Sequence, residues 1–303
     1  MTSPFGVLAL IADPGMRAQL PAVERALAAR GLEHRTFVAN GVDPAAVARD
    51  ALDEGHRFVV AVGDDATVQG VVNGMFRDGR TILEEPVLGV IPGGNGSDLA
   101  RSFGLPNDAG TAAVHMAGEH TYPMDLMKVT ASLPDGGHAT RYAHNLAQVG
   151  MGAEQAARAA TAPTWLGGAR RFAGFWRGYL ATKATAVTVE HDTRTWEGTA
   201  WNVVVANAQF TDGGLRLSPR SFPGDGILDA LVFTGPRSGA YTLLPRLFRH
   251  GDHIPDPHIK ELKARIRFEV RSERPFPVVA DGVPFGMTPV TFQVVPRPIL
   301  FKL

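Results

Sequence analysis

Short apolar segments alternate with amphipathic segments over roughly the first 120 residues. The apolar runs predict strands at Phe5–Ala12, Thr36–Ala39, Phe58–Val62 and Val87–Ile91. Between them, apolar residues recur at helical spacing and predict helices at Arg17–Arg30, Pro44–Asp53 and Thr67–Arg77. This order of elements is typical of a parallel sheet covered by helices, so it predicts an α/β domain over residues 1–122.

From Met124 onward the pattern changes to closely spaced apolar stretches. The predicted strands are Asp125–Thr130, Tyr142–Gln148, Ala186–Glu190, Trp201–Asn207, Ile227–Phe233, Arg265–Val270, Pro277–Asp281 and Val290–Val295. One clear helical pattern, Ser238–Arg249, interrupts them. We therefore expect a largely antiparallel β-sandwich over residues 123–296, with the apolar tail 297–303 free to return to the first domain.

Composition narrows the classes of partner. Thirty basic and thirty acidic side chains give a formal net charge of +0, so no broad positive field favours nucleic acid. The absence of cysteine excludes disulfides and thiolate chemistry. No apolar run approaches the ~20 residues that span a bilayer, and the first residues lack a signal-peptide pattern. The sequence predicts a soluble, cytoplasmic protein with at most transient membrane contact, and it leaves a homodimer open.

Two glycine-rich loops follow predicted strands and precede helical patterns. The first runs from Gly63 to Thr67, and the second runs from Pro92 to Asp98. Backbone N–H groups at a helix start can bind phosphate, and loops at the carboxyl ends of neighbouring parallel strands line one crevice. Each loop by itself is equally well explained as a structural connector, but the pair predicts one shared ligand.

The loops and the segments around them resemble the family of diacylglycerol, sphingosine and bacterial lipid kinases. Residues 63–67 with Val71-Val72-Asn73-Gly74 are similar to the signature G-G-D-G-T…V-V-N-G, and residues 92–100 are similar to P-L-G-T-G-N-D-F-A. Further matches in the same order are Met124–Leu126, Asn145–Gly152, Asn207 with Gly213-Gly214, Asp225–Asp229 and Asp281–Pro284. The resemblance covers nearly the whole chain.

The resemblance implies ATP-dependent phosphate transfer to a hydroxyl of a lipid or hydrophobic small molecule, in a cleft between the domains. It implies that ATP is bound by Gly63, Asp64, Thr67, Gly94, Asn95 and Gly96. It also implies that Asp65, Asp98 and Asp125 organise Mg²⁺ and water near the transferred phosphate. The alternative for Asp65 and Asp98 is a helix cap, which is a common place for aspartate.

A second cation site is implied near the D-G-L-L-D segment. Its ligands would be the side chain of Asp225 and the carbonyl groups of Phe222 and Ile227, and such oxygen ligands suit Mg²⁺ or Ca²⁺. The alternative is that Pro223–Gly226 forms an ordinary turn.

Several positions depart from the family pattern. The catalytic glutamate of D-G-E-P is replaced by Val283, which cannot accept a proton. In the first loop Asp64 and Ala66 replace glycines; the added carboxylate would repel phosphate, and alanine resists a positive φ. Asp281 could replace the base only in a shifted strand register, and His144 is the other candidate.

Two hypotheses follow from these matches and departures. The first is a lipid-kinase-like phosphotransferase. The second is a non-phosphorylating family member, either a binding protein or an enzyme that carries out another reaction on a hydrophobic metabolite. The aromatic and basic stretch from Trp165 to Tyr179 fits a lid over a lipid cleft or a membrane-interface helix, and the alternative is interdomain packing.

Overall fold

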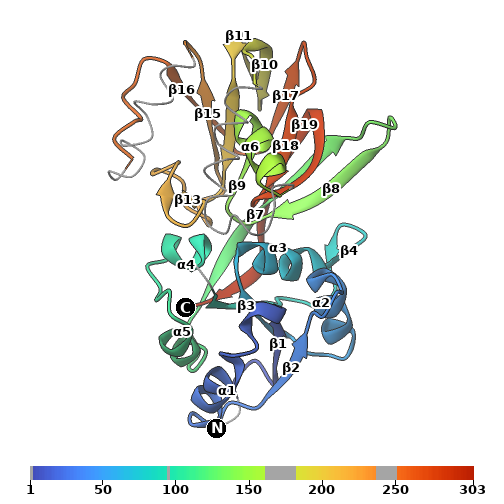
Figure 1. The fold of residues 1–303 in the computed structure, drawn as a ribbon, viewed down its shortest axis with the longest axis vertical. Coiled ribbons are helices and arrows are strands. Elements are labelled where there is room, and N and C mark those ends of the chain that lie inside the picture. Colours follow the sequence, from blue (N-terminus) through green and yellow to red (C-terminus); the bar gives the residue numbers. More distant parts are fainter. Residues whose placement is uncertain (1–2, 94–95, 161–181, 237–250) are drawn as a thin grey trace. The chain divides into compact units, whose positions relative to one another are not determined.

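The chain divides into two compact units. The computed structural model describes residues 3–93, 96–160, 182–236 and 251–303 (Figure 1). Unit 1 comprises Met1–Leu126 and Pro296–Leu303, and unit 2 comprises Met127–Val295. The predicted helix Ser238–Arg249 and the stretch from Trp165 to Tyr179 lie outside the described residues, as do Gly94 and Asn95.

Unit 1 is built on a parallel sheet. Its strands are β1 (Leu8–Ala12), β2 (His34–Val38), β3 (Phe58–Gly63), β6 (Val87–Pro92) and the end of β19 (Val283–Lys302). They lie in the order β2-β1-β3-β6-β19, and each neighbouring pair is parallel. Strand β2 thus lies on one side of β1, and β3 lies on the other side. This reversal of strand order places a topological switch point between β1 and β3.

Helices cover both faces of this sheet. The helices are α1 (Leu20–Ala28), α2 (Pro44–Asp53), α3 (Asp65–Gly74), α4 (Asp98–Ser102) and α5 (Ala109–His115). Alternate residues of β1 and β3, which point to one face, form a core with the apolar side chains of α1 and α5. Helices α2 and α3 pack against each other on the other side of the strands. Helix α3 ends earlier than predicted, and Phe76–Arg77 instead form strand β4, which pairs with β5 (Arg80–Thr81).

A buried lysine lies at the end of β19 in unit 1. Lys302 is 1% exposed, and its Nζ donates to main-chain oxygen atoms of His120 (2.9 Å) and Leu303 (2.6 Å). Leu300 and Phe301 pair with Val87 and Leu88 of β6. Burial lowers the pKa of Lys302, because an ammonium group is less well solvated in the interior.

We expect Lys302 to make the stability of the protein rise with pH. With its pKa lowered in the folded state, the unfolded chain binds more protons in the interval between the folded and the unfolded pKa, so the free energy of unfolding increases across that interval. Denaturant unfolding of the wild type and of Lys302→Met from neutral pH to about pH 10.5 measures this effect. The difference, wild type minus variant, should grow with pH, and a constant difference would contradict the assignment.

Unit 2 is an antiparallel β-sandwich. One run of strands is β16 (Ile259–Ala264), β15 (Leu228–Phe233), β12 (Asn202–Ala206), β9 (Leu146–Gly150), β18 (Pro277–Ala280) and β19. A second run joins β11 (Arg194–Ala200), β10 (Thr185–His191), β17 (Arg267–Ser272) and β19. Strands β7 (Thr121–Ser132) and β8 (His138–Ala143) form a further antiparallel pair, and helix α6 (Met151–Ala160) follows β9.

The inward side chains of these strands form the core of unit 2. It includes Val129, Val149, Val189, Val232 and Phe268, and the alternation of buried and exposed positions in β10 is typical of a strand with one solvated face. The α/β first part and the antiparallel sandwich confirm the fold class expected from the sequence. Strand β19 is much longer than the predicted Val290–Val295, because it continues from unit 2 into the sheet of unit 1.

Candidate functional site

The first glycine loop connects β3 to α3 in unit 1. Asp64 precedes the helix, and its Oδ1 accepts hydrogen bonds from the N–H (3.1 Å) and the Oγ1 (3.1 Å) of Thr67. Asp64 is therefore an N-cap, and it satisfies a helix-start donor that glycine would leave to solvent. Ala66 lies within α3 without a positive φ, so the expectation of backbone strain at this position is wrong.

Asp65 links the two glycine loops. Its Oδ1 accepts from Ser97 Oγ (3.0 Å) and from the N–H of Asp98 (3.0 Å), and Oδ2 lies 3.3 Å from the same N–H. Ser97 is fully buried. Because Asp65 begins α3 and Asp98 begins α4, these bonds hold the starts of both helices together. The sequence did not predict this link, because Ser97 and Asp98 lie 32 and 33 residues after Asp65 in the chain.

The second loop is fixed from the other side by a residue outside the family signature. Asn107 Oδ1 accepts from the N–H of Ser97 (2.9 Å), and a Cβ on Gly96 would lie 2.6 Å from that same oxygen. Gly96 has φ +88°, which suits glycine alone at that contact. Arg101 donates from Nη1 to Asp98 Oδ1 (2.9 Å), and the Asp98 carboxylate is nearly fully buried. These contacts fix the conformation of the second loop where it meets α4.

Side chains of Thr67 and Asp13 lie so close to the backbone at the end of β3 that this position requires glycine. A Cβ on Gly63 would lie 2.5 Å from Thr67 Oγ1 and 3.1 Å from Cβ of Asp13, so a larger residue cannot enter without displacing the loop. The backbones of the two loops also meet directly, since the N–H of Gly93 donates to the carbonyl of Gly63 (2.8 Å). The structure therefore brings both loops together at the carboxyl ends of β3 and β6, as the sequence predicted.

Asp125 lies in the part of β7 that belongs to unit 1. It is 2% exposed, and its Oδ1 accepts from the N–H of Arg297 (2.9 Å) in β19. In the part of the chain that the structure describes, no group of three acidic or histidine side chains forms a candidate metal site. The three proposed acids thus have structural hydrogen bonds: Asp65 and Asp98 belong to the loop contact, and Asp125 binds β19.

Unit 2 carries the Asp281 motif in a tight turn. Asp281 (φ +45°) and Gly282 (φ +80°) connect β18 to β19, and Ala280 pairs with Val283 across them. Two successive positive φ values describe a type I′ turn, for which Asp-Gly is a favoured pair. Val283 therefore begins β19 directly after the turn, and its side chain is partly exposed.

The Asp281 carboxylate organises the segment between β8 and β9. Oδ2 accepts from the N–H of His144 (2.8 Å), and Oδ1 accepts from the N–H groups of Asn145 (3.0 Å) and Leu146 (3.0 Å). His144 Nδ1 lies 2.9 Å from Oδ2, and both side chains are completely buried. These bonds explain why the predicted strand Tyr142–Gln148 is interrupted, since its backbone donors turn to a side chain instead of a neighbouring strand.

This arrangement counts against both of the alternative bases considered from the sequence. Asp281 already accepts three backbone hydrogen bonds at a buried position, so it is a structural anchor. His144 contacts that anchor and is fully buried. Neither side chain is accessible to a substrate hydroxyl in this structure.

The proposed cation ligands lie in one turn of unit 2. Asp225 Oδ1 accepts from the N–H of Ile227 (3.0 Å), and the carbonyl of Phe222 accepts from the N–H of Gly224 (2.8 Å). The side chain–backbone bond is that of an Asx turn, which stabilises the loop by itself. The oxygen atoms present are of the type that Mg²⁺ or Ca²⁺ binds, so both interpretations of this turn remain proposals.

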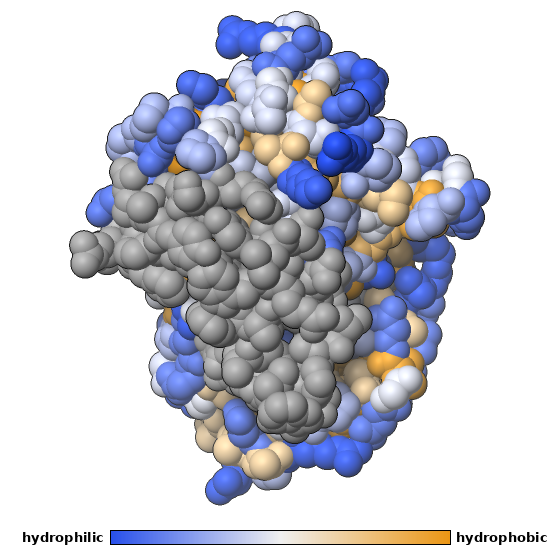
Figure 2. Space-filling model, turned by 45° about the horizontal axis from the view of Figure 1, so that its top comes forward, coloured by the Kyte–Doolittle hydropathy of each residue, from blue (hydrophilic) through white to orange (hydrophobic). Residues whose placement is uncertain are grey.

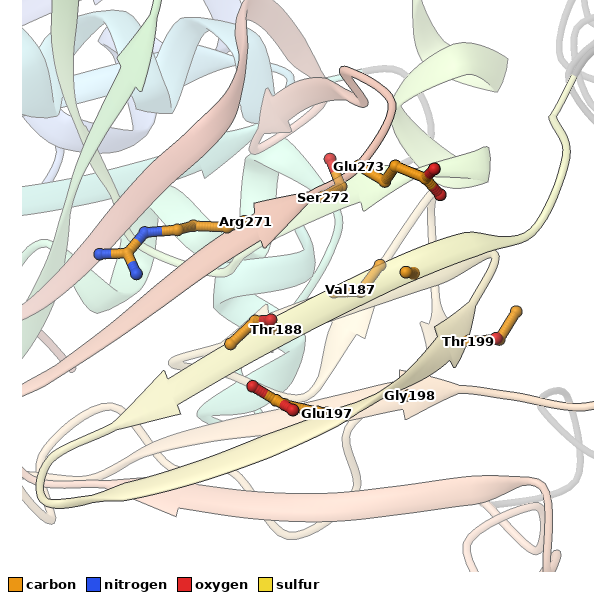
Figure 3. A pocket seen from close by; sticks show the side chains of 9 residues that line it. Val187, Thr188, Glu197, Gly198, Thr199, Arg271, Ser272 and Glu273 are labelled. Atoms are coloured by element: carbon orange, nitrogen blue, oxygen red, sulfur yellow. The ribbon is translucent and has the colours of Figure 1, made fainter.

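A shallow groove of about 490 Å³ lies elsewhere on unit 2 (Figure 3). It crosses β10, β11 and β17, and its lining residues are Ala186, Val187, Thr188, Glu197, Gly198, Thr199, Arg271, Ser272 and Glu273. None of the motif residues discussed above lines it. Arg271 pairs with Glu190 (2.8 Å) and Glu269 (2.6 Å), so its charge is already neutralised.

Comparisons with known proteins agree with the matched motifs. The model of the diacylglycerol kinase catalytic domain matches residues 14–129. The model of the YegS C-terminal NAD kinase beta sandwich-like domain matches residues 146–301. A diacylglycerol kinase of Bacillus subtilis is 25% identical over 255 residues, which are 82% of this chain and 78% of that protein. A probable lipid kinase YegS-like of Stenotrophomonas maltophilia is 26% identical over 265 residues, covering 84% of this chain and 81% of the other.

Solved structures share the fold. A putative diacylglycerol kinase from Bacillus anthracis superposes with a TM-score of 0.76 at 21% identity, and the match covers 99% of this chain and 98% of that one. An NAD kinase from Archaeoglobus fulgidus, solved in complex with ATP, superposes with a TM-score of 0.52 at 15% identity over 98% of this chain and 94% of the other. Because the two family models together account for most of both units, this chain belongs to the diacylglycerol kinase family.

Proposed function

We propose that this protein is a lipid-kinase-like phosphotransferase that binds ATP with Mg²⁺ at the two glycine loops of unit 1. The observation that carries the proposal is the direct link between the loops through Asp65, Ser97 and Asp98. The link holds two helix starts at the carboxyl ends of neighbouring parallel strands, where backbone N–H groups can face phosphate oxygens. The relatives named diacylglycerol kinase and lipid kinase support a lipid as the acceptor.

Six residues of the two glycine loops are the proposed nucleotide-binding residues. Gly63, Asp64 and Thr67 belong to the first loop, and Gly94, Asn95 and Gly96 belong to the second. The carboxylates of Asp65, Asp98 and Asp125 would hold Mg²⁺ through water molecules, because each of them already accepts hydrogen bonds from protein groups. Mg²⁺ commonly uses one or two carboxylates together with substrate phosphates, so a complete protein cage is not required. When bound, the ion would neutralise charge that develops on the transferred phosphate.

This chain has no accessible carboxylate at the position of the general base that would activate the acceptor hydroxyl. Val283 occupies the place of the family glutamate, and the neighbouring Asp281 carboxylate is committed to backbone N–H groups. Loss of a positioned general base typically lowers a rate by ~10²–10⁴-fold. We therefore propose slow phosphate transfer to a hydroxyl of a lipid or another hydrophobic molecule.

A second candidate function is favoured by these same residues. A protein without an accessible base can retain the fold and use it to bind a hydrophobic ligand or to carry out another reaction. Nucleotide binding separates the two functions, because a non-phosphorylating member has no need of ATP.

We expect ATP·Mg²⁺ to raise the melting temperature of the protein. At about 100 times its Kd a ligand adds about 2.7 kcal/mol to the free energy of unfolding. Thermal denaturation with and without ATP·Mg²⁺ or ADP·Mg²⁺ measures the effect. Gly63→Ala should abolish it, because the added Cβ would lie 2.5 Å from Thr67 Oγ1.

Gly110→Ala is the matched control for this loop substitution. Gly110 lies in α5, and a Cβ there would meet its nearest neighbour, Asp108 Oδ1, at an ordinary distance of 3.6 Å. This variant should retain the full shift. If the wild type shows no shift with any purine nucleotide, the non-phosphorylating function is the correct one.

A further inference from the structure

One apolar side chain of unit 2 is far more exposed than the others. Ile266 is 68% exposed, whereas the next most exposed large apolar residue of the described chain, Val42, is 52% exposed. In the view of Figure 2 the described surface is mostly hydrophilic, with small and separate apolar spots. A single exposed apolar residue is ordinary on a protein surface, so its surroundings decide whether it has a role.

The backbone around Ile266 is held in place by a carboxylate. Asp192, in the turn between β10 and β11, accepts from the N–H groups of Arg265 (2.8 Å), Ile266 (2.9 Å) and Arg267 (3.1 Å). The carbonyl of Ile266 accepts from the N–H of Val294 (3.0 Å). Burial acts to raise the pKa of Asp192, but the three amide donors together lower it. The carboxylate thus remains charged at neutral pH. Its three hydrogen bonds fix the backbone that carries the exposed side chain of Ile266.

Three arginines lie close to this position along the backbone. Arg265 and Arg267 flank Ile266 in the connection between β16 and β17, and Arg194 follows the Asp192 turn. All three are exposed, and within the described residues their guanidinium groups have no ion pair or hydrogen bond, in contrast to Arg220 and Arg271. The Asp192 carboxylate is directed to backbone amides. We call Arg194, Arg265, Ile266 and Arg267 the basic tip.

The basic tip lies at the end of unit 2 that carries the family motifs. The register of the strands shows this. Ala264 of β16 pairs with Leu228 of β15, and the next residue of β15, Asp229, pairs with Ala206 of β12. Ala206 also pairs with Leu146 of β9, and the next residue of β9, Ala147, pairs with Ala280 of β18. Arg265 therefore follows β16 at the end where the Asp225 turn, His144–Asn145 and Asp281–Val283 also lie. Four strand spacings separate β16 from β18, which is on the order of 20 Å.

We propose that the basic tip is a docking surface for an anionic phospholipid bilayer. Guanidinium groups bind lipid phosphates, and an aliphatic side chain between them can enter the boundary between headgroups and acyl chains. A soluble phosphate would leave Ile266 in water, so the apolar centre favours a lipid surface. The inference rests on the proposed function, because a lipid acceptor reaches the protein from a bilayer, and the tip shares an end of unit 2 with the acceptor-side motif.

Vesicle cosedimentation of the full chain tests this proposal without requiring catalysis. We expect binding to phosphatidylcholine vesicles that contain phosphatidylglycerol and much weaker binding to phosphatidylcholine alone. Each arginine near an anionic surface contributes about fivefold, so the triple variant Arg194→Gln, Arg265→Gln and Arg267→Gln should bind about 10²-fold more weakly. Ile266→Asn should weaken binding about tenfold.

Control variants remove the same number of charges, or one exposed apolar side chain, elsewhere. The triple variant Arg25→Gln, Arg30→Gln and Arg80→Gln alters exposed residues of unit 1, and Val42→Asn replaces an exposed apolar residue there. Both should bind like the wild type, and thermal denaturation should show that every variant is folded. Equal losses in the two triple variants would overturn the proposal, because net charge alone would then explain binding.

Three other outcomes would also overturn it. These are equal binding to neutral vesicles, unchanged binding by the tip variants, and displacement by soluble glycerophosphate at the same phosphate concentration. Phosphate transfer to a dispersed short-chain acceptor is measured in parallel. Transfer without vesicle binding would refute the docking surface and leave the proposed function intact, whereas tip-dependent binding without transfer would support the surface and count against the kinase.

Discussion

Replacing Val283 with glutamate is expected to raise phosphate transfer to diacylglycerol or phosphatidylglycerol by up to about 10²-fold, the lower range for a positioned general base. Position 283 begins β19 directly after the Asp281–Gly282 turn, and its side chain is partly exposed. A glutamate there could extend away from the buried Asp281 and present an accessible carboxylate. Radiolabelled phosphate transfer from ATP, measured for the wild type and the variant under the same conditions, provides the test.

Val283→Gln is the control for this substitution. Glutamine has nearly the shape of glutamate but cannot act as a base at neutral pH, so it should leave the rate near that of the wild type. An equal gain for both variants would show that polarity or packing at position 283, and not proton transfer, limits the reaction. If the wild type already transfers phosphate rapidly, the chain has another base.

Replacing Asp281 with alanine is expected to lower the free energy of unfolding by about 3–5 kcal/mol. The substitution leaves the N–H groups of His144, Asn145 and Leu146 without their acceptor in a buried segment, and unsatisfied buried groups are costly. It also removes the carboxylate that lies 2.9 Å from His144 Nδ1. Chemical denaturation at neutral pH, followed by fluorescence or circular dichroism, measures the loss.

Asp192→Ala is a close control, because the two aspartates share their local geometry. Both have positive φ values, +45° at Asp281 and +51° at Asp192, and both accept three consecutive backbone N–H groups. They differ in burial, since Asp192 is at the surface and Asp281 is in the interior. Water can replace the acceptor at Asp192, so its loss should be only about 1 kcal/mol. Equal losses would mean that backbone strain, and not burial, dominates at Asp281.

The buried Asp281 also bears on what the chain can do chemically. From the sequence it was one of two residues that could stand in for the missing glutamate. In the structure it serves as an acceptor for the segment between β8 and β9, and His144 is buried against it. The deficit at Val283 is therefore not compensated by an exposed neighbour on that turn, which is why the glutamate substitution is expected to have a large effect.

The sequence by itself determined the architecture and the family. Apolar runs such as Phe58–Val62 and the glycine turns after them predicted a parallel sheet, because a strand buried on both faces requires continuous apolar residues. The same local signals placed both glycine loops at the ends of β3 and β6. The ordered series of motifs then identified the family, since each motif is a short segment whose spacing is visible in the chain.

Only the tertiary structure decided the roles of the polar residues. Asp65 meets Ser97 across 32 residues, Asp281 meets His144 across 137, and Asp192 meets Arg265 across 73. Such partners are brought together by strand order and register, and no local pattern encodes them. The same is true of Lys302, whose position in an apolar tail gave no sign that its ammonium group would be enclosed. Local periodicity determines which segments are buried, whereas the hydrogen-bond partner of a buried charge depends on the packing of distant segments.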